Sequence, residues 1–177
     1  MKVLRFATLL GILALALPGT ADAQTPQARD GFWFNVGLGY GSLGCENCDG
    51  REGGVSGSLS LGGTVSSRLL VGVGTTGWTR EEEGARLTAG TLTALARFYP
   101  SAAGGLFLVG GLGLGSVEAS FGGLSARENG GAVVLGLGYD FRIGSNMSLT
   151  PFWNGAGISA SDVNTNYGQI GLGFTMH

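Results

Sequence analysis

Few side chains in this sequence have the type and spacing that catalysis needs. The only histidine, His177, is the last residue of the chain, where we expect it to fray and to lack a fixed partner. A serine or cysteine nucleophile needs a base held in a fixed orientation beside it. We therefore expect no catalytic residue, and lipid-modifying chemistry is the weakest functional hypothesis. No cofactor is expected either, because the glycine clusters lie within strand-like segments and form no phosphate-binding loop.

The two cysteines, Cys45 and Cys48, lie three positions apart in a polar segment. This spacing also occurs in redox sites at helix N-termini and in zinc sites, but the segment looks like a surface loop and no further Cys or His ligands are available. In an oxidising compartment a pair of nearby thiols forms a disulfide by default. We favour a local disulfide that fixes this loop over the redox and zinc alternatives.

Three charged residues fall on the faces of strand-like segments that otherwise carry small residues. They are Arg97, Asp140 and Arg142. If these faces line the interior of a barrel, the charges must be paired, because burying a lone charge is costly. We expect one hydrogen-bonded cluster in which the two guanidinium groups grip the carboxylate. The functional alternative is that these residues form a gate or a proton path through the interior of the barrel.

An acidic run is formed by Glu81, Glu82 and Glu83. The plain interpretation is solvated loop surface. Carboxylates also suit hard divalent cations, which could bridge to lipopolysaccharide phosphates. We expect no metal site, and these three glutamates are the only weak candidates.

The N-terminal segment has the pattern of a secretory signal. Lys2 and Arg5 provide the positive start, residues 9–17 are an apolar run with one glycine, and Ala21-Asp22-Ala23 matches the small-x-small cleavage box. The apolar run is too short to cross roughly 30 Å of hydrocarbon, which argues against a membrane anchor. The expected organisation is a signal peptide at 1–23, a short periplasmic segment at 24–30 and one domain at 31–177.

The composition of the chain is unusual for a water-soluble domain. Charged residues make up 12%, and 36 of the 177 residues are glycine. Soluble domains usually carry about twice that share of charge. The net charge of −2 offers no basic patch for nucleic acid. Since no stretch after the signal reaches the ~18 apolar residues of a membrane helix, the apolar area must lie on single faces of strands.

Alternation with a period of two supports this organisation. In residues 31–41, Phe32, Val36 and Leu38 share one face, and Asn35 and Gly37 share the other. Eight such segments follow one another and predict an all-β, eight-stranded antiparallel up-and-down barrel. The expected long connections are 42–53, 79–85, 119–130 and 159–166, and the short ones are 66–68, 100–105 and 144–146. In a barrel that spans an outer membrane, long loops face the exterior and short turns the periplasm.

Aromatic residues near the strand ends predict two belts at the membrane interfaces. The expected belt members are Phe32, Phe98, Phe107, Phe141, Trp153 and Phe174 at the periplasmic end and Tyr40, Trp78 and Tyr167 at the other. In a soluble barrel the outer faces would be polar, whereas here the small and polar residues lie on the inner faces. The inversion favours a membrane barrel.

With these patterns the chain resembles the small outer-membrane β-barrel family of the OmpA, OmpX and OmpW type. The resemblance covers residues 24–177 and rests on pattern. It implies contact with outer-membrane lipid and lipopolysaccharide of a Gram-negative bacterium, and insertion by the barrel-assembly machinery. That machinery favours a C-terminal aromatic residue, whereas here Phe174 is followed by three further residues.

We expect a monomer with a structural or surface-interaction role, in envelope integrity or loop-mediated binding. The alternative is a narrow channel or transporter for small or apolar solutes.

Overall fold

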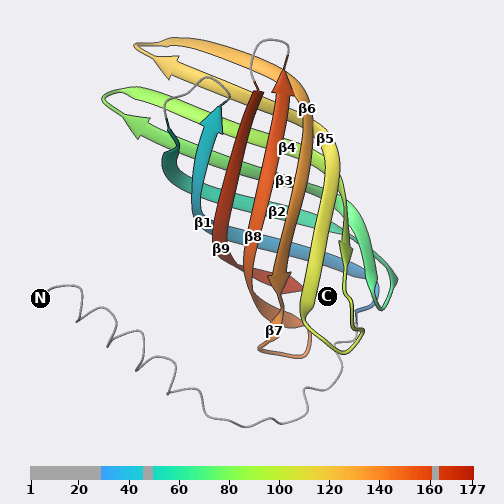
Figure 1. Cartoon of the computed structure of the whole chain (residues 1–177). Coiled ribbons are helices and arrows are strands. Elements are labelled where there is room, and N and C mark those ends of the chain that lie inside the picture. The colour runs from blue at the N-terminus through green and yellow to red at the C-terminus, as the bar shows by residue number, and fades with distance from the viewer. Residues whose placement is uncertain (1–28, 46–49, 161–163) are drawn as a thin grey trace, which may run out of the picture.

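The chain forms a closed, tilted β-barrel (Figure 1). The computed structural model describes residues 29–45, 50–160 and 164–177. The expected signal peptide and most of the segment at 24–30 lie outside this part. Its strands are β1 (Phe32–Cys45), β2 (Glu52–Ser66), β3 (Leu69–Glu82), β4 (Ala85–Phe98), β5 (Leu106–Phe121), β6 (Leu124–Tyr139), β7 (Phe141–Arg142), β8 (Met147–Ala160) and β9 (Asn164–Met176). Within the described ranges, no helix is long and apolar enough to cross a membrane.

The nine labelled strands make an eight-stranded antiparallel barrel. β1 pairs with β2 and β9, and β6 pairs with β8, so the sheet closes on itself. β6 and β7 are one strand, because Gly138 lies opposite Phe152 and Phe141 lies opposite Leu149 without a shift in register. The ladder is interrupted between these pairs, where Pro151 has no N–H to donate. The predicted fold class is confirmed.

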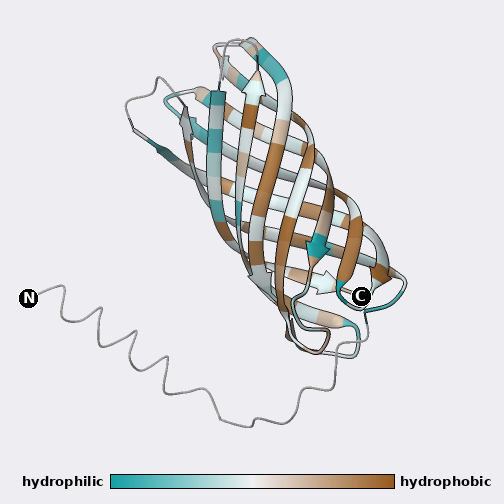
Figure 2. Cartoon of the chain, turned by 45° about the vertical axis from the view of Figure 1, so that its right-hand side comes forward, coloured by the Kyte–Doolittle hydropathy of each residue, from teal (hydrophilic) through white to brown (hydrophobic). Residues whose placement is uncertain are grey.

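Below the extracellular end the outer wall is apolar, as the alternation predicted. Leucine, valine, isoleucine and aromatic side chains are exposed on successive strands, and hydrophobic residues recur along the barrel wall in Figure 2. A wall of this kind suits the hydrocarbon interior of a bilayer. The end that carries the start of β1, the C-terminus and the short turns is assigned to the periplasm, and the opposite end to the cell exterior.

The predicted aromatic belts are only partly correct. Six of the nine residues are exposed on the outer wall: Phe32, Tyr40, Phe98, Phe141, Trp153 and Phe174. The other three, Trp78, Phe107 and Tyr167, are buried in the interior. Each follows the strand alternation, since its immediate neighbours in the strand point outward. Whether an aromatic side chain points inward or outward is therefore predicted better by its place in the strand alternation than by its closeness to a strand end.

Two expected long loops are instead continuous strands. β3 and β4 are joined by Glu83 and Gly84 with φ of 50° and 81°, and β5 and β6 by Gly122 and Gly123 with φ of 58° and 86°. Two successive residues with positive φ form the tight hairpin turn that matches strand twist. The expected loops at 79–85 and 119–130 therefore extend the barrel wall rather than interrupt it.

Four strands project beyond their neighbours at the extracellular end. β2 is last paired with β3 at Thr79, and β8 first meets β6 at Gly130. Beyond these points β3, β4, β5 and β6 pair only with one another, and their two hairpins project past the rim in Figure 1. We call this projection the extracellular sheet; it comprises residues 80–82, 85–87, 118–121 and 124–129.

Candidate functional site: a closed lumen and an extracellular groove

The upper half of the barrel interior is filled by an apolar cluster. Trp78 and Tyr167 are its largest members, packed with Leu43, Ala89, Ala132, Val134, Ala156 and Ile158. The Trp78 indole N–H donates to the Gly41 carbonyl at 3.1 Å, and the Tyr167 hydroxyl lies 2.6 Å from the hydroxyl of Thr76. Since both polar tips have partners, the two rings are held across the lumen in fixed positions.

A second cluster closes the lower half. Trp33, Leu70, Tyr99 and Phe107 are buried together, with Leu95 packed against them. The Arg97 guanidinium carbon lies 4.9 Å from the centre of the Trp33 ring and 4.1 Å from that of Phe107. Arg97 is only 4% exposed. A guanidinium between two ring faces is stabilised by their quadrupoles, and more strongly where water is excluded.

Between the clusters lies one small polar cavity. Its volume is about 40 Å³, and its walls include Asn35, Ser60, Thr93, Arg97 and Asn154. A single water needs on the order of 10–15 Å³ of such space. The cavity thus has room for a few waters and no larger solute.

Asp140 is the centre of a polar network at the periplasmic end. It is 1% exposed, and it accepts hydrogen bonds from the hydroxyls of Tyr99 and Thr150, both at 2.7 Å. The His177 ring nitrogen Nε2 lies 3.4 Å from the same carboxylate. The expectation that His177 frays is therefore wrong, because the terminal ring is 4% exposed and lies inside the barrel end.

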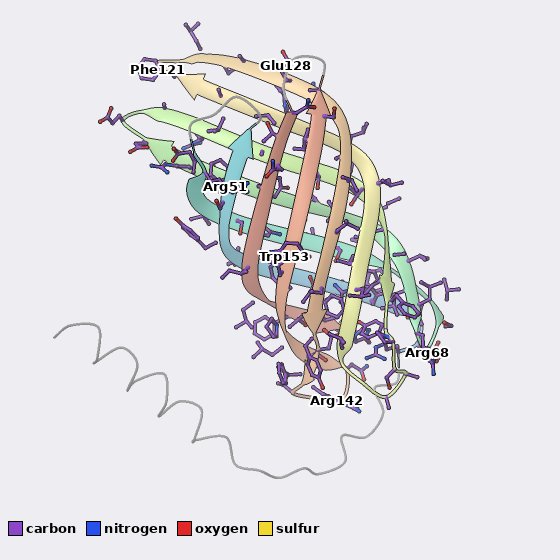
Figure 3. The ribbon with its side chains drawn as sticks, in the orientation of Figure 1. Arg51, Arg68, Phe121, Glu128, Arg142 and Trp153 are labelled. Carbon is purple, nitrogen blue, oxygen red and sulfur yellow. The ribbon has the colours of Figure 1, made fainter. Side chains whose placement is uncertain are left out.

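The three charged residues singled out from the sequence are placed differently. Arg97 and Asp140 both lie in the lower lumen, where the polar contacts of Asp140 are with the hydroxyls of Tyr99 and Thr150 and with the His177 ring. Arg142 donates to the carbonyls of Gly144 and Ser145, both at 2.9 Å. Figure 3 places it at the barrel end opposite Phe121. Arg97 and Asp140 thus share the lower lumen, and one hydrogen-bonded cluster of all three residues stays a prediction.

Arg29 was not anticipated from the sequence, since it precedes the first strand. Its guanidinium donates to the carbonyls of Ser67, Ala102 and Gly104, at 3.4, 3.0 and 2.5 Å. The guanidinium carbon also lies 3.5 Å from the centre of the Tyr99 ring. One side chain thereby ties two periplasmic turns to the lower cluster.

Replacing Arg29 by alanine should lower the free energy of unfolding by about 1.5–3 kcal/mol, the range for hydrogen bonds made by a charged group. Arg29→Lys keeps the positive charge, so its loss of stability should be smaller. The loss should not vanish, because a compact ammonium group does not reproduce the forked donors of the guanidinium. Urea unfolding in lipid vesicles measures both. Equal stability of Arg29→Ala and the unaltered protein would show that this contact contributes nothing.

The acidic run is used in ion pairs. Glu81 accepts from Arg86 at 2.7 Å, and Arg80 pairs with both Glu82, at 2.5 Å, and Glu52. Glu83 lies in the β3–β4 turn. Among the residues with described placement, no group of three or more His, Cys, Asp or Glu side chains could hold a metal ion. The predicted Cys45–Cys48 disulfide involves side chains outside the described part of the chain.

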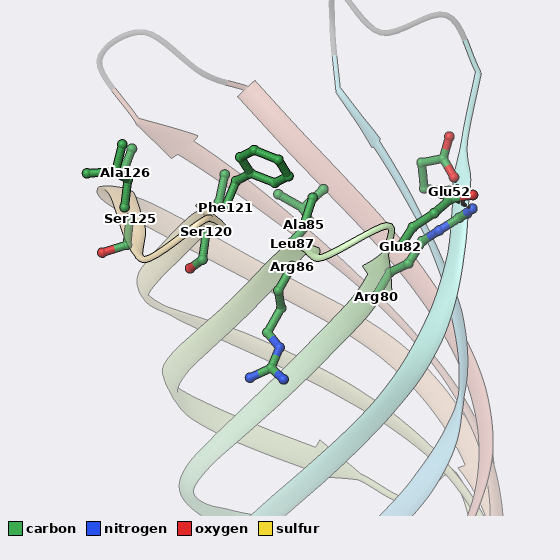
Figure 4. Close-up of a pocket in the computed structure, with 12 residues that line it drawn as sticks. Glu52, Arg80, Glu82, Ala85, Arg86, Leu87, Ser120, Phe121, Ser125 and Ala126 are labelled. Atoms are coloured by element: carbon green, nitrogen blue, oxygen red, sulfur yellow. Dashed lines mark hydrogen bonds and ion pairs between the residues drawn. The ribbon is translucent and has the colours of Figure 1, made fainter.

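A groove lies on the inner face of the extracellular sheet (Figure 4). Its volume is about 500 Å³, and its floor consists of Ala85, Leu87, Ala119, Phe121, Leu124 and Ala126, with Glu52, Arg80 and Glu82 at one side. Phe121 is 66% exposed and Leu124 is 81% exposed. The apolar face is continuous with the lumen, since Leu87 also packs on the upper cluster.

The opposite face of the extracellular sheet is polar. It carries the Glu81–Arg86 pair and the Glu118–Arg127 pair, whose closest atoms are 2.7 and 3.7 Å apart. The sheet is therefore amphipathic, although no described element covers its apolar side. Exposed apolar area of this kind on a folded surface marks an interaction site or a ligand groove.

No protein-family model matches the sequence, and no curated protein matches it in sequence. Solved structures do match the fold. Neisserial surface protein A is 18% identical, with a TM-score of 0.65 over 82% of this chain and 96% of that one. Ail, the attachment invasion locus protein of Yersinia pestis, is 17% identical, with a TM-score of 0.60 over 83% of this chain and 99% of its own. This chain has the fold of the small outer-membrane β-barrels.

Proposed function

We propose that this outer-membrane barrel acts at the cell surface through its extracellular sheet and does not conduct solutes through its lumen. The observation that carries the proposal is the closed interior. Two apolar clusters fill the lumen, and the cavity between them measures about 40 Å³. An eight-stranded barrel is just wide enough for its own side chains to fill it. The channel alternative would need both clusters to move.

The extracellular end has the features that the lumen lacks. Its groove is more than ten times larger than the interior cavity, opens to the exterior and has an apolar floor. Both hairpin turns are tight, so the surface is held by paired strands rather than by long loops. The names of the two structural neighbours, a surface protein and an attachment protein, are compatible with such a role. We expect a monomer inserted by the barrel-assembly machinery, without enzyme activity.

Two measurements test the proposal. The purified protein should show no single-channel steps in a planar bilayer.

Cells that display the protein should adhere to protein-coated surfaces more than cells without it. Phe121→Asp with Leu124→Asp should abolish this gain in adhesion, because two carboxylates would disrupt the apolar floor of the groove. The matched control is Thr79→Asp with Asn129→Asp, which adds the same charge on the polar face outside the groove. Channel steps, or adhesion unaffected by the groove variant, would contradict the proposal.

A further inference from the structure

Arg97 is a buried cation whose hydrogen-bond donors are only partly used. The Trp33 and Phe107 rings lie over its guanidinium group, with ring centres 4.9 and 4.1 Å from the guanidinium carbon. The N–H donors of a guanidinium lie in its plane, so contacts with ring faces leave them free for other partners. Nε and Nη1 of Arg97 are buried, and no described residue accepts a hydrogen bond from either atom. Unpaired donors on a buried charge are costly.

The small polar cavity in the middle of the barrel lies against this side chain. Its walls include Arg97, Ser58, Ser60, Thr93 and Asn154, and among the described residues that line it there is no Asp or Glu. Hydroxyl and amide groups can donate hydrogen bonds to an anion. The volume of about 40 Å³ corresponds to about three waters. The cavity is therefore a small space with one cation and several neutral donors in its wall.

The buried charges of the described residues are unbalanced. Arg29 and Arg97 are buried cations, and Asp140 is the one buried carboxylate. Both oxygens of Asp140 already accept hydrogen bonds, Oδ1 from Thr150 and Oδ2 from Tyr99. One positive charge is thus left in excess, and a buried charge without a counter-charge is costly. A small anion in the cavity would supply the missing charge and accept the hydrogen bonds of Arg97.

We propose that the cavity beside Arg97 binds a chloride ion. Chloride is only slightly larger than a water molecule, so it fits with one or two waters, whereas an organic anion does not. The ion would contact side chains from three strands, since Arg97 and Thr93 belong to β4, Ser58 and Ser60 to β2, and Asn154 to β8. It is a structural ion, because apolar clusters close the lumen above and below it. The site is independent of the proposed surface function.

The test is the chloride dependence of folding. The full chain is refolded into vesicles and unfolded by urea while gluconate, which is too large for the cavity, replaces chloride stepwise. Constant ionic strength keeps the screening of surface charges the same. Because the site exists only in the folded barrel, the folding equilibrium constant should rise about tenfold for each tenfold increase in chloride above the dissociation constant. Refolding in each salt lets the ion enter before the lumen closes.

Two arginine variants show whether the dependence arises at this site. Arg97→Gln removes the buried charge and should abolish the chloride dependence. Arg68→Gln, the matched control, removes an exposed arginine in the turn between β2 and β3 and should keep it. Folding of the unaltered protein that does not depend on chloride, or an equal dependence in Arg97→Gln, would overturn the proposal and leave a cavity that holds water only.

A direct measurement on the unaltered protein covers the case in which Arg97→Gln does not fold. Bromide has the same charge as chloride and scatters X-rays anomalously. Crystals grown in bromide should show an anomalous peak in the cavity beside Nε and Nη1 of Arg97. Bromide peaks confined to the outer surface would contradict a chloride site in the lumen.

Discussion

Replacing Asp140 by alanine is expected to lower the free energy of unfolding by about 3–5 kcal/mol, the range for breaking a buried charge network by removing one partner. The carboxylate accepts hydrogen bonds from Tyr99 and Thr150, and its burial is nearly complete. Without it, two buried hydroxyls lose an acceptor. The positive charge of Arg97 also loses the one buried carboxylate among the described residues.

The measurement is the temperature at which the folded, gel-shifted form converts to the unfolded one, supported by urea unfolding in vesicles. Asp140→Asn keeps an oxygen acceptor for a hydroxyl while removing the charge, so its loss should be smaller. Tyr99→Phe removes a single donor and should cost about 1.5–3 kcal/mol. If Asp140→Ala kept its stability and raised ion conductance, Asp140 would be a gate, and the channel hypothesis would replace the closed-lumen proposal.

The barrel itself could be predicted from the sequence because every membrane strand repeats the same period-two pattern. Apolar side chains such as Val36 and Leu135 face lipid, while glycine and hydroxyl residues fill a narrow interior. The register of β4 followed the same rule. Leu87 and Leu95 point inward although they are apolar, because they lie on the same face of the strand as the buried residues Thr93 and Arg97.

The extracellular sheet could not be predicted in this way, because strands outside the bilayer need no row of apolar side chains that faces lipid. Residues 119–130 are polar on one face, which is typical of a loop, yet Ala119, Phe121, Leu124 and Ala126 alternate on the other. The Gly122–Gly123 pair between them was the available signal for a tight hairpin.

The periplasmic network could not be predicted for a different reason. His177 is 37 residues from Asp140, and Arg29 is 73 and 75 residues from Ala102 and Gly104. Only barrel closure brings these groups together, so no local spacing in the sequence reveals them. The expected partner Arg142 was chosen from strand parity alone. The chain turns at Gly144 and Ser145 directly after it, and their carbonyls accept its hydrogen bonds instead.

The lipid-facing wall gives the second large effect. Leu135 is 62% exposed near the middle of β6, and its neighbours across the strands are Gly110 and Gly155. Leu135→Arg should lower the free energy of unfolding in a bilayer by about 2–4 kcal/mol, the cost of an arginine at the midplane of a barrel wall. Glycine on both sides offers the guanidinium neither an anion nor a side-chain acceptor.

The matched control is an arginine on the same face of the same strand but beyond the bilayer. Ser125→Arg should change the free energy of unfolding by no more than about 0.5 kcal/mol, because an exposed surface substitution removes no packing and buries no charge. Gly136 is unsuitable for comparison, since an added Cβ would lie 2.6 Å from the Trp153 carbonyl oxygen and 2.1 Å from Asn154 Oδ1. Urea unfolding in vesicles compares the two arginine variants. An equal loss for both would mean that position 135 does not face hydrocarbon, and the assignment of the apolar wall to the membrane would fail with it.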